Sequence, residues 1–156
     1  MILLPALLLG CGPSAQEKAA QDYVAGMTPL LKDNTKLSRY FLELAAQIKK
    51  QRTSPQQVSE RLQSEIIPAA RALHTGAEAI QPEVAPLDGI HIGLVRAWNN
   101  RLRAYESMHK AWVAGDLAAF EGATSDHKTV FKAEARYFDS IGPVLEEYQL
   151  SLTQYP

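Results

Sequence analysis

The chain has 156 residues, 46% of them hydrophobic and 21% charged, which fits one folded domain and excludes an intrinsically disordered protein. Its 16 basic and 17 acidic side chains leave a formal net charge of -1, so it lacks the basic excess that nucleic-acid binding requires. The single cysteine excludes a disulfide framework within one chain and any multi-cysteine zinc site.

The chain opens on an apolar, uncharged segment over residues 1–10 that runs directly into the only cysteine, Cys11. A segment this short cannot span a bilayer, which takes ~20 residues of helix, and Pro5 disfavours a buried core helix. It suits the apolar part of an export signal, which is ~7–15 residues long and ends in a small residue such as Gly10. The alternative is an incidental or buried cysteine behind an apolar start.

The four residues Leu8-Leu9-Gly10-Cys11 resemble the lipobox of bacterial lipoproteins. The resemblance implies that the Cys11 sulfur receives a diacylglyceryl group, that the chain is cut before it, and that the new amino terminus is acylated, with palmitate as a typical acyl chain. Leu9 departs from the small or β-branched residue that is usual at its position. The basic residues that open such signals are missing after Met1, so we expect this signal to be incomplete.

The resemblance divides the chain into a signal peptide over residues 1–10, a lipidated N-terminus over 11–13 and a single domain over 14–156. It implies a lipid-anchored protein of the cell membrane or outer membrane of a bacterium, facing the periplasm or the exterior. Gly12, rather than aspartate, follows the cysteine, which by analogy with enteric bacteria indicates the outer membrane. Two or three acyl chains anchor a protein stably where one does not, because each buried methylene contributes ~0.8 kcal/mol.

Apolar residues spaced by three and four predict four helices after Cys11, and alanine and leucine outnumber the strand-favouring valine, isoleucine and threonine. The first helix begins at a capping box, Ser14 to Glu17, and the second at Ser54-Pro55 with Gln57 completing a weaker box. The inward stripe of the first is Ala20, Tyr23, Met27, Leu30, Asn34, Leu37, Phe41, Leu44 and Ile48. That of the second is Val58, Leu62, Ile66, Ala69, Leu73, Ala77 and Ile80.

The third helix is predicted to begin at Asp88 as its cap, and the fourth at Asp116, after a C-terminal glycine, Gly115. The stripe of the third is His91, Leu94, Trp98, Arg101 or Leu102, Tyr105, Met108 and Trp112. That of the fourth is Leu117, Phe120, Thr124, His127, Phe131, Glu134, Phe138, Ile141, Leu145, Tyr148 and Leu152.

Short loops between long helices predict an all-α fold, an antiparallel up-down-up-down four-helix bundle. The first and fourth patterns are longer than the other two and contain Pro29 and Pro143. We expect kinks at these prolines, with residues 14–27 and 143–153 forming a two-helix extension that points toward Cys11.

Several polar residues fall at inward positions of these stripes: Asn34, His91, Arg101, His127 and Glu134. One interpretation is a metal site with His74, His91 and Glu134 as ligands, and Met27 with His91 is the nearest pair for a haem. The Glu-x-x-His pairs of di-iron bundles and the C-x-x-C-H haem attachment are both missing from the sequence. The interpretation we favour is a set of hydrogen-bonded core residues that fix the helix register.

Large aromatic residues recur every seven positions on the third helix, at Trp98, Tyr105 and Trp112. Such a row usually packs in a core, which we favour, but it also suits a groove for a partner's helix or peptide. Basic residues on the same helix, such as Arg96 and Arg103, favour a solvated face over a contact with anionic lipid or a cell-wall polymer.

The sequence contains no glycine-rich phosphate loop, nucleophile elbow or His-Glu-x-x-His pair. We therefore expect a non-enzymatic envelope lipoprotein, a membrane-tethered module that binds or scaffolds another envelope protein. Such a module needs no cofactor besides the covalent lipid on Cys11, and no nucleic acid. The alternative is a metal- or haem-binding helical bundle.

Overall fold

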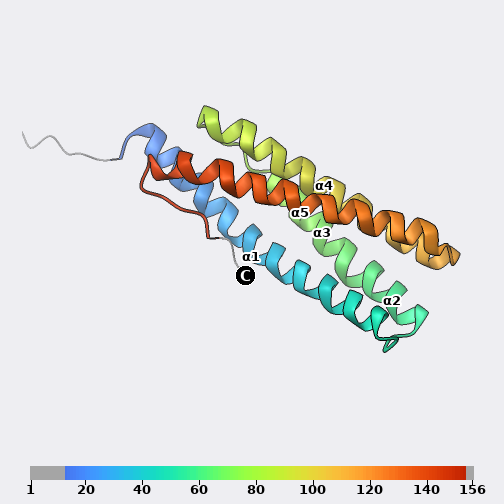
Figure 1. Ribbon diagram of the computed structural model, residues 1–156. Coiled ribbons are helices and arrows are strands. Elements are labelled where there is room, and N and C mark those ends of the chain that lie inside the picture. The colour runs from blue at the N-terminus through green and yellow to red at the C-terminus, as the bar shows by residue number, and fades with distance from the viewer. Residues whose placement is uncertain (1–12, 154–156) are drawn as a thin grey trace, which may run out of the picture.

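The computed structural model describes residues 13–153, and every regular element in that range is helical. The helices are α1 (Ala15–Lys49), α2 (Pro55–Arg61), a π-helical turn η1 (Leu62–Ile66), α3 (Ile67–Glu78), α4 (Ala85–Ala114) and α5 (Leu117–Glu146). Because α2, η1 and α3 continue one another, Figure 1 shows four long stretches lying alongside one another. The prediction of an all-α fold with four helical stretches is confirmed. The predicted signal peptide and Cys11 lie outside the described residues.

The helix starts follow local capping chemistry. Ser14 accepts a hydrogen bond from the Glu17 backbone N–H at 3.1 Å, and the Glu17 carboxylate accepts one from the Ser14 N–H, so the predicted capping box is confirmed. Ser54 forms the same box with its partner at N3, and Asp116 caps α5 by accepting from the Ala119 N–H at 2.9 Å.

The predicted start of the third helix was wrong. α4 begins at Ala85, and Val84 is the residue before it. Pro86 lies in the first turn, where backbone N–H groups have no partner within the helix, so a proline there costs no hydrogen bond. Asp88 therefore lies inside the first turn, where its negative charge suits the positive end of the helix dipole.

The contacts between α4 and α5 set their relative direction. Trp98 bonds to Glu134 and Tyr105 bonds to His127, so residue numbers rise along α4 as they fall along α5. α5 packs chiefly on α4, whereas α1 packs chiefly on α3. α1 and α5 meet through side chains at two levels, where Tyr23 bonds to Tyr137 and where the Phe41 ring contacts His127.

The buried face of α5 differs in phase from the predicted stripe. Ala123, Val130 and Tyr137 are buried, although none of them was predicted to face inward. Phe131, which was predicted to be buried, is 41% exposed, and Leu117 is 68% exposed. A helix that packs mainly against one neighbour buries the face toward that neighbour, so the side chains one position away come to line its edge.

A π-helical turn in the second stretch accompanies Pro68. Proline has no N–H to give to the carbonyl of Ser64, and the preceding Ile67 N–H bonds to the Leu62 carbonyl, five residues back. The turn holds one extra residue, so Ile67 is buried beside Ile66. The stripe then continues at buried Ala70 rather than at the predicted Ala69, which is only partly buried.

The C-terminal end of α5 lies at Glu146, earlier than the predicted 153. The chain turns at Gln149, where φ is 57°, and the residues after it fold back toward α1 (Figure 1). Pro29 and Pro143 lie inside α1 and α5. Tyr23, in the segment predicted to extend beyond Pro29, is buried and contacts α4 and α5.

Three helices end through a residue in the left-handed region: Gly115 after α4 (φ 68°), Gln51 after α1 (φ 52°) and Gln149 after α5. In each case the following N–H bonds to a carbonyl five residues back, as Arg52 does to Gln47 at 2.9 Å. Glycine adopts this conformation freely, whereas a side chain there costs ~1–2 kcal/mol. Two of the three turns therefore use glutamine where glycine would be less strained.

We expect Gln51→Gly to raise the free energy of unfolding by about 0.5–1 kcal/mol, because relief of the left-handed strain outweighs the added entropy of the unfolded chain. Urea denaturation measures the change. Gln21→Gly is the matched control, since Gln21 is exposed inside α1 and the same replacement there should lower stability by ~1 kcal/mol. Equal destabilisation by both variants would contradict the prediction.

Candidate functional site

A first group of buried polar side chains, the tyrosine layer, consists of Tyr23, His91 and Tyr137. His91 Nε2 lies 2.9 Å from the Ala77 carbonyl, and since a carbonyl only accepts, Nε2 carries the ring proton. With a single ring proton, Nδ1 accepts from the Tyr23 hydroxyl at 3.1 Å, which leaves Tyr137 to donate to Tyr23 at 2.9 Å. One directed chain of hydrogen bonds thus joins α1, α3, α4 and α5.

Burial keeps both hydroxyls of the tyrosine layer protonated. It raises the pKa of Tyr23 to about 12, against a smaller lowering by the hydrogen bond from Tyr137. The pKa of Tyr137 is also raised, first by burial and then by its contact with Tyr23.

A second group, the arginine layer, lies two turns further along α4 and consists of Asn34, Trp98, Arg101 and Glu134. Arg101 is 1% exposed and Glu134 7%. Glu134 Oε1 accepts from the Trp98 indole N–H at 2.8 Å and lies 3.0 Å from Arg101 Nη1, while Arg101 Nη2 donates to Asn34 Oδ1. The Nη1 contact has the length of an ion pair but not the angles of a hydrogen bond, so Nη1 donates no hydrogen bond within residues 13–153.

His127 lies beside the arginine layer in a cluster of rings. Its Nε2 is 2.8 Å from the Tyr105 hydroxyl, and its ring centroid is 4.3 Å from that of Phe41. Burial, and then the charge of Arg101, lowers the pKa of His127 to about 4. Burial raises the pKa of Tyr105, so both partners are neutral near pH 7. Together the two layers fix the register of all four helical stretches, as hydrogen-bonded core residues would.

The structure separates the three residues considered as metal ligands. Glu134 belongs to the arginine layer and His91 to the tyrosine layer, and both use their polar atoms there. His74 Nε2 lies 3.4 Å from Glu78 Oε1, and His74 and His91 line a surface hollow of about 460 Å³ that Glu134 does not reach. Within residues 13–153 no three His, Cys, Asp or Glu side chains group closely enough to hold a metal ion.

The aromatic row on α4 does not form an open groove. Trp98 and Tyr105 are buried in the core, as the interpretation we favoured for the row requires. Trp112 is partly buried, and its indole N–H donates to the Pro55 carbonyl at 2.8 Å while its ring contacts Phe120. The residues considered as a partner groove therefore join α4 to α2 and α5 instead.

An open groove does exist, but between α1 and α5. It comprises two adjoining hollows that share Leu42 and Phe131, of about 720 Å³ beside the arginine layer and about 350 Å³ beside His127. Glu134 and Asn34 line the larger hollow. Leu42 is 60% exposed, and large apolar side chains off the buried stripe were the sequence signal that could have located this groove.

No described helix has both the length and the apolar composition needed to cross a membrane. No family model, curated protein or solved structure matches the chain.

We expect Arg101→Met to lower the free energy of unfolding by about 3 kcal/mol, because it leaves the Glu134 carboxylate buried without its cation. Adding Glu134→Gln should recover much of the loss, since an amide oxygen still accepts from Trp98 and no charge remains. Urea denaturation of the two single variants and the double variant measures this coupling. Arg71→Met is the control: it breaks an exposed pair with Glu106 and should cost less than ~1 kcal/mol. Additive single effects would contradict the coupling.

Stability should fall as the pH falls from about 6.5 to about 4. Over that range the unfolded chain protonates His127 while the folded chain, with its lowered pKa, does not, a difference on the order of 3 kcal/mol. His127→Gln should remove this part of the pH dependence, measured by urea denaturation at several pH values. Tyr105→Phe should retain it, because burial and Arg101 lower the pKa and the hydroxyl does not. Identical profiles for the parent and His127→Gln would contradict the assignment.

Proposed function

We propose that the chain is a membrane-tethered cell-envelope lipoprotein and a non-enzymatic binding or scaffold module. The observation that carries the proposal is the apolar segment that ends in Leu8-Leu9-Gly10-Cys11. The folded domain begins immediately afterwards, since the capping box at Ser14 starts α1. Cleavage before Cys11 would therefore remove none of the described helices and would leave the acylated residue next to the helical body.

The proposed location is the outer face of the cell membrane or an outer-membrane leaflet, reached through two or three acyl chains on Cys11. The proposed partner is another envelope protein. The open α1–α5 groove supports a binding role, because exposed Leu42 and Phe131 lie along it.

We also propose that the four stretches form an up-down-up-down antiparallel bundle, with α1 and α5 extended past Pro29 and Pro143 toward Cys11. Support comes from contact pairs: Arg61 bonds to Gln47, and Leu30 lies over Gly76, so residue numbers fall along the second stretch as they rise along α1. Figure 1 has the start of α1 and the end of α5 at one end of the molecule. In this arrangement the anchor would hold that end at the membrane, and the groove would lie along the other half of α1.

Cys11→Ser should release the protein from membranes and reduce labelling by radioactive palmitate to background, because serine cannot take the thioether-linked diacylglycerol. Fractionation of cells into membrane and soluble material, with labelling of the purified protein, measures both effects.

Ser14→Ala is the matched control, three residues further on. It removes the cap of α1, at a cost of ~1 kcal/mol in stability, but should leave labelling and membrane retention unchanged. Membrane retention of Cys11→Ser, together with an unlabelled parent protein, would defeat the anchor.

A further inference from the structure

The smaller hollow of the α1–α5 groove, about 350 Å³, has the walls of an apolar ligand site. Its volume falls within the ~300–1,000 Å³ of small-molecule pockets. Its apolar walls come from α1, η1 and α5, which contribute Phe41, Leu42, Leu44, Ala45, Ile48, Leu62, Phe120 and Phe131.

The polar groups that line this hollow are basic or already bonded. Thr124 donates to the Phe120 carbonyl at 2.9 Å, and His127, neutral near pH 7, bonds to Tyr105. Lys49 and Lys128 are the remaining polar lining residues, and the side chain of neither makes an ion pair or hydrogen bond with a described residue. No carboxylate is among the residues that line the hollow, so its charge is positive.

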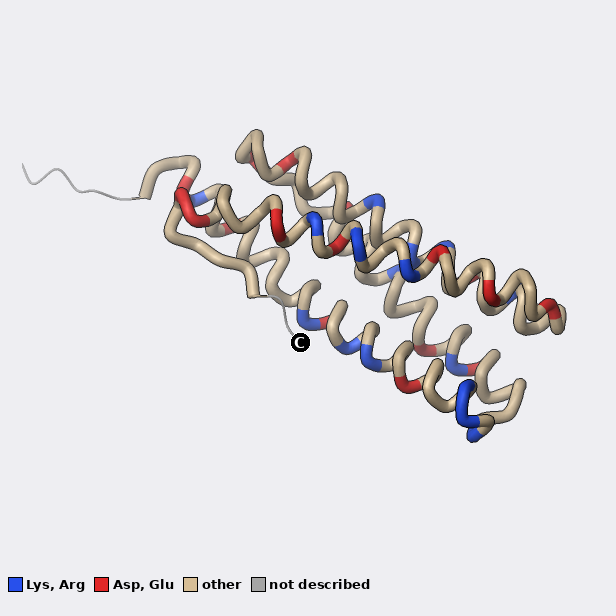
Figure 2. The backbone as a smooth tube through the Cα atoms, viewed as in Figure 1, with Lys and Arg blue, Asp and Glu red and all other residues tan. Residues whose placement is uncertain are grey.

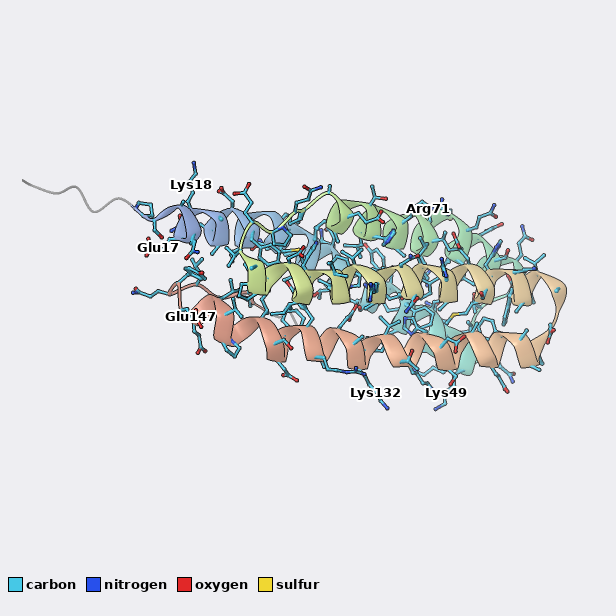
Figure 3. The ribbon with its side chains drawn as sticks, turned by 90° about the horizontal axis from the view of Figure 1, so that it is seen from above. Glu17, Lys18, Lys49, Arg71, Lys132 and Glu147 are labelled. Carbon is cyan, nitrogen blue, oxygen red and sulfur yellow. The ribbon has the colours of Figure 1, made fainter. Side chains whose placement is uncertain are left out.

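The lysines stand on the two helices that border the hollow, Lys49 near the end of α1 and Lys128 on α5. Figure 2 shows basic residues along both helices, and Figure 3 shows Lys49 of α1 and Lys132 of α5 extending to the same side of the molecule. Because Lys49 and Lys128 both line the hollow, an anion at its mouth would meet positive charge from both helices.

We propose that this hollow binds one alkyl chain of an anionic amphiphile, with the carboxylate or phosphate headgroup at Lys49 and Lys128. The alkyl chain would pack against the apolar walls, and the anionic headgroup would pair with the two lysine ammonium groups. The lining contains two lysines and no carboxylate, so the hollow favours a ligand with one apolar chain and a negatively charged end over a neutral or basic one. The site does not depend on the anchor at Cys11.

The test is calorimetric titration of full-length protein carrying Cys11→Ser, so that no attached acyl chain competes. Octanoate, decanoate and laurate should bind one to one, with affinity rising roughly fourfold for each methylene that enters the hollow. Dodecyl phosphate and dodecanol complete the series: the first replaces the carboxylate and the second removes the charge. Tighter binding of the carboxylate indicates a fatty acid as the source, and tighter binding of the phosphate indicates a phospholipid headgroup.

Two variants locate the ligand. Ala45→Trp fills the hollow and should weaken laurate binding at least tenfold. Lys49→Gln with Lys128→Gln changes only exposed side chains, so folding is preserved; it should weaken laurate about tenfold and leave dodecanol unchanged. Lys110→Gln, on α4 and away from the hollow, is the control and should change neither affinity.

Three results would overturn the proposal. The first is no binding of either laurate or dodecyl phosphate. The second is laurate binding that neither Ala45→Trp nor the double lysine variant weakens. The third is a dimer that Ala45→Trp disrupts in the absence of laurate binding, which would assign the hollow to a second copy of the chain.

Discussion

The buried ion pair of Arg101 and Glu134 is the constraint on which the rest of the arrangement depends. Each charge is tolerated in the core only while the other is beside it, and together they engage Trp98 on α4 and Asn34 on α1. Sliding α5 by one helical turn, ~5.4 Å, would leave both charges unpaired. The pair therefore selects one register of α4 against α5 and ties α1 to it, rather than maximising stability.

The α1–α5 groove lies beside the Arg101–Glu134 pair, and side-chain contacts join α1 to α5 on either side of that pair. Toward the start of α1, the tyrosine layer draws α1 and α5 together through the hydroxyls of Tyr23 and Tyr137. On the other side, the Phe41 ring of α1 contacts the His127 ring of α5 with centroids 4.3 Å apart, and Phe131 packs on His127 from the same helix. These three rings form part of the wall of the smaller apolar hollow.

Sequence reasoning located what is decided locally. The capping boxes at Ser14 and Ser54 and the glycine turn at Gly115 depend on neighbouring residues alone, and the structure has all three. The inward positions of His91, Arg101, His127 and Glu134 followed from helical periodicity in the same way.

What the sequence could not supply was the pairing between distant positions. Asn34 and Arg101 are separated by 67 residues, and only the packed register shows that Glu134 meets an arginine rather than two histidines. The stripe predicted for the second stretch is displaced by the π-turn before Pro68, and the stripe predicted for α5 is displaced because α5 packs mainly on α4. Strict periodicity assumes an uninterrupted helix and a symmetric set of neighbours.

The proposed anchor precedes α1 in the chain, whereas the proposed hollow lies beside the second half of that helix. Ser14 and Ala45 are separated by roughly 45 Å along α1 at 1.5 Å per residue, more than the thickness of the hydrocarbon core of a bilayer. With α1 perpendicular to the anchoring membrane, an alkyl chain still embedded there could not reach the hollow. In that orientation the ligand is an amphiphile that has left the membrane, and the unpaired Lys49 and Lys128 would capture it from water by its charged headgroup.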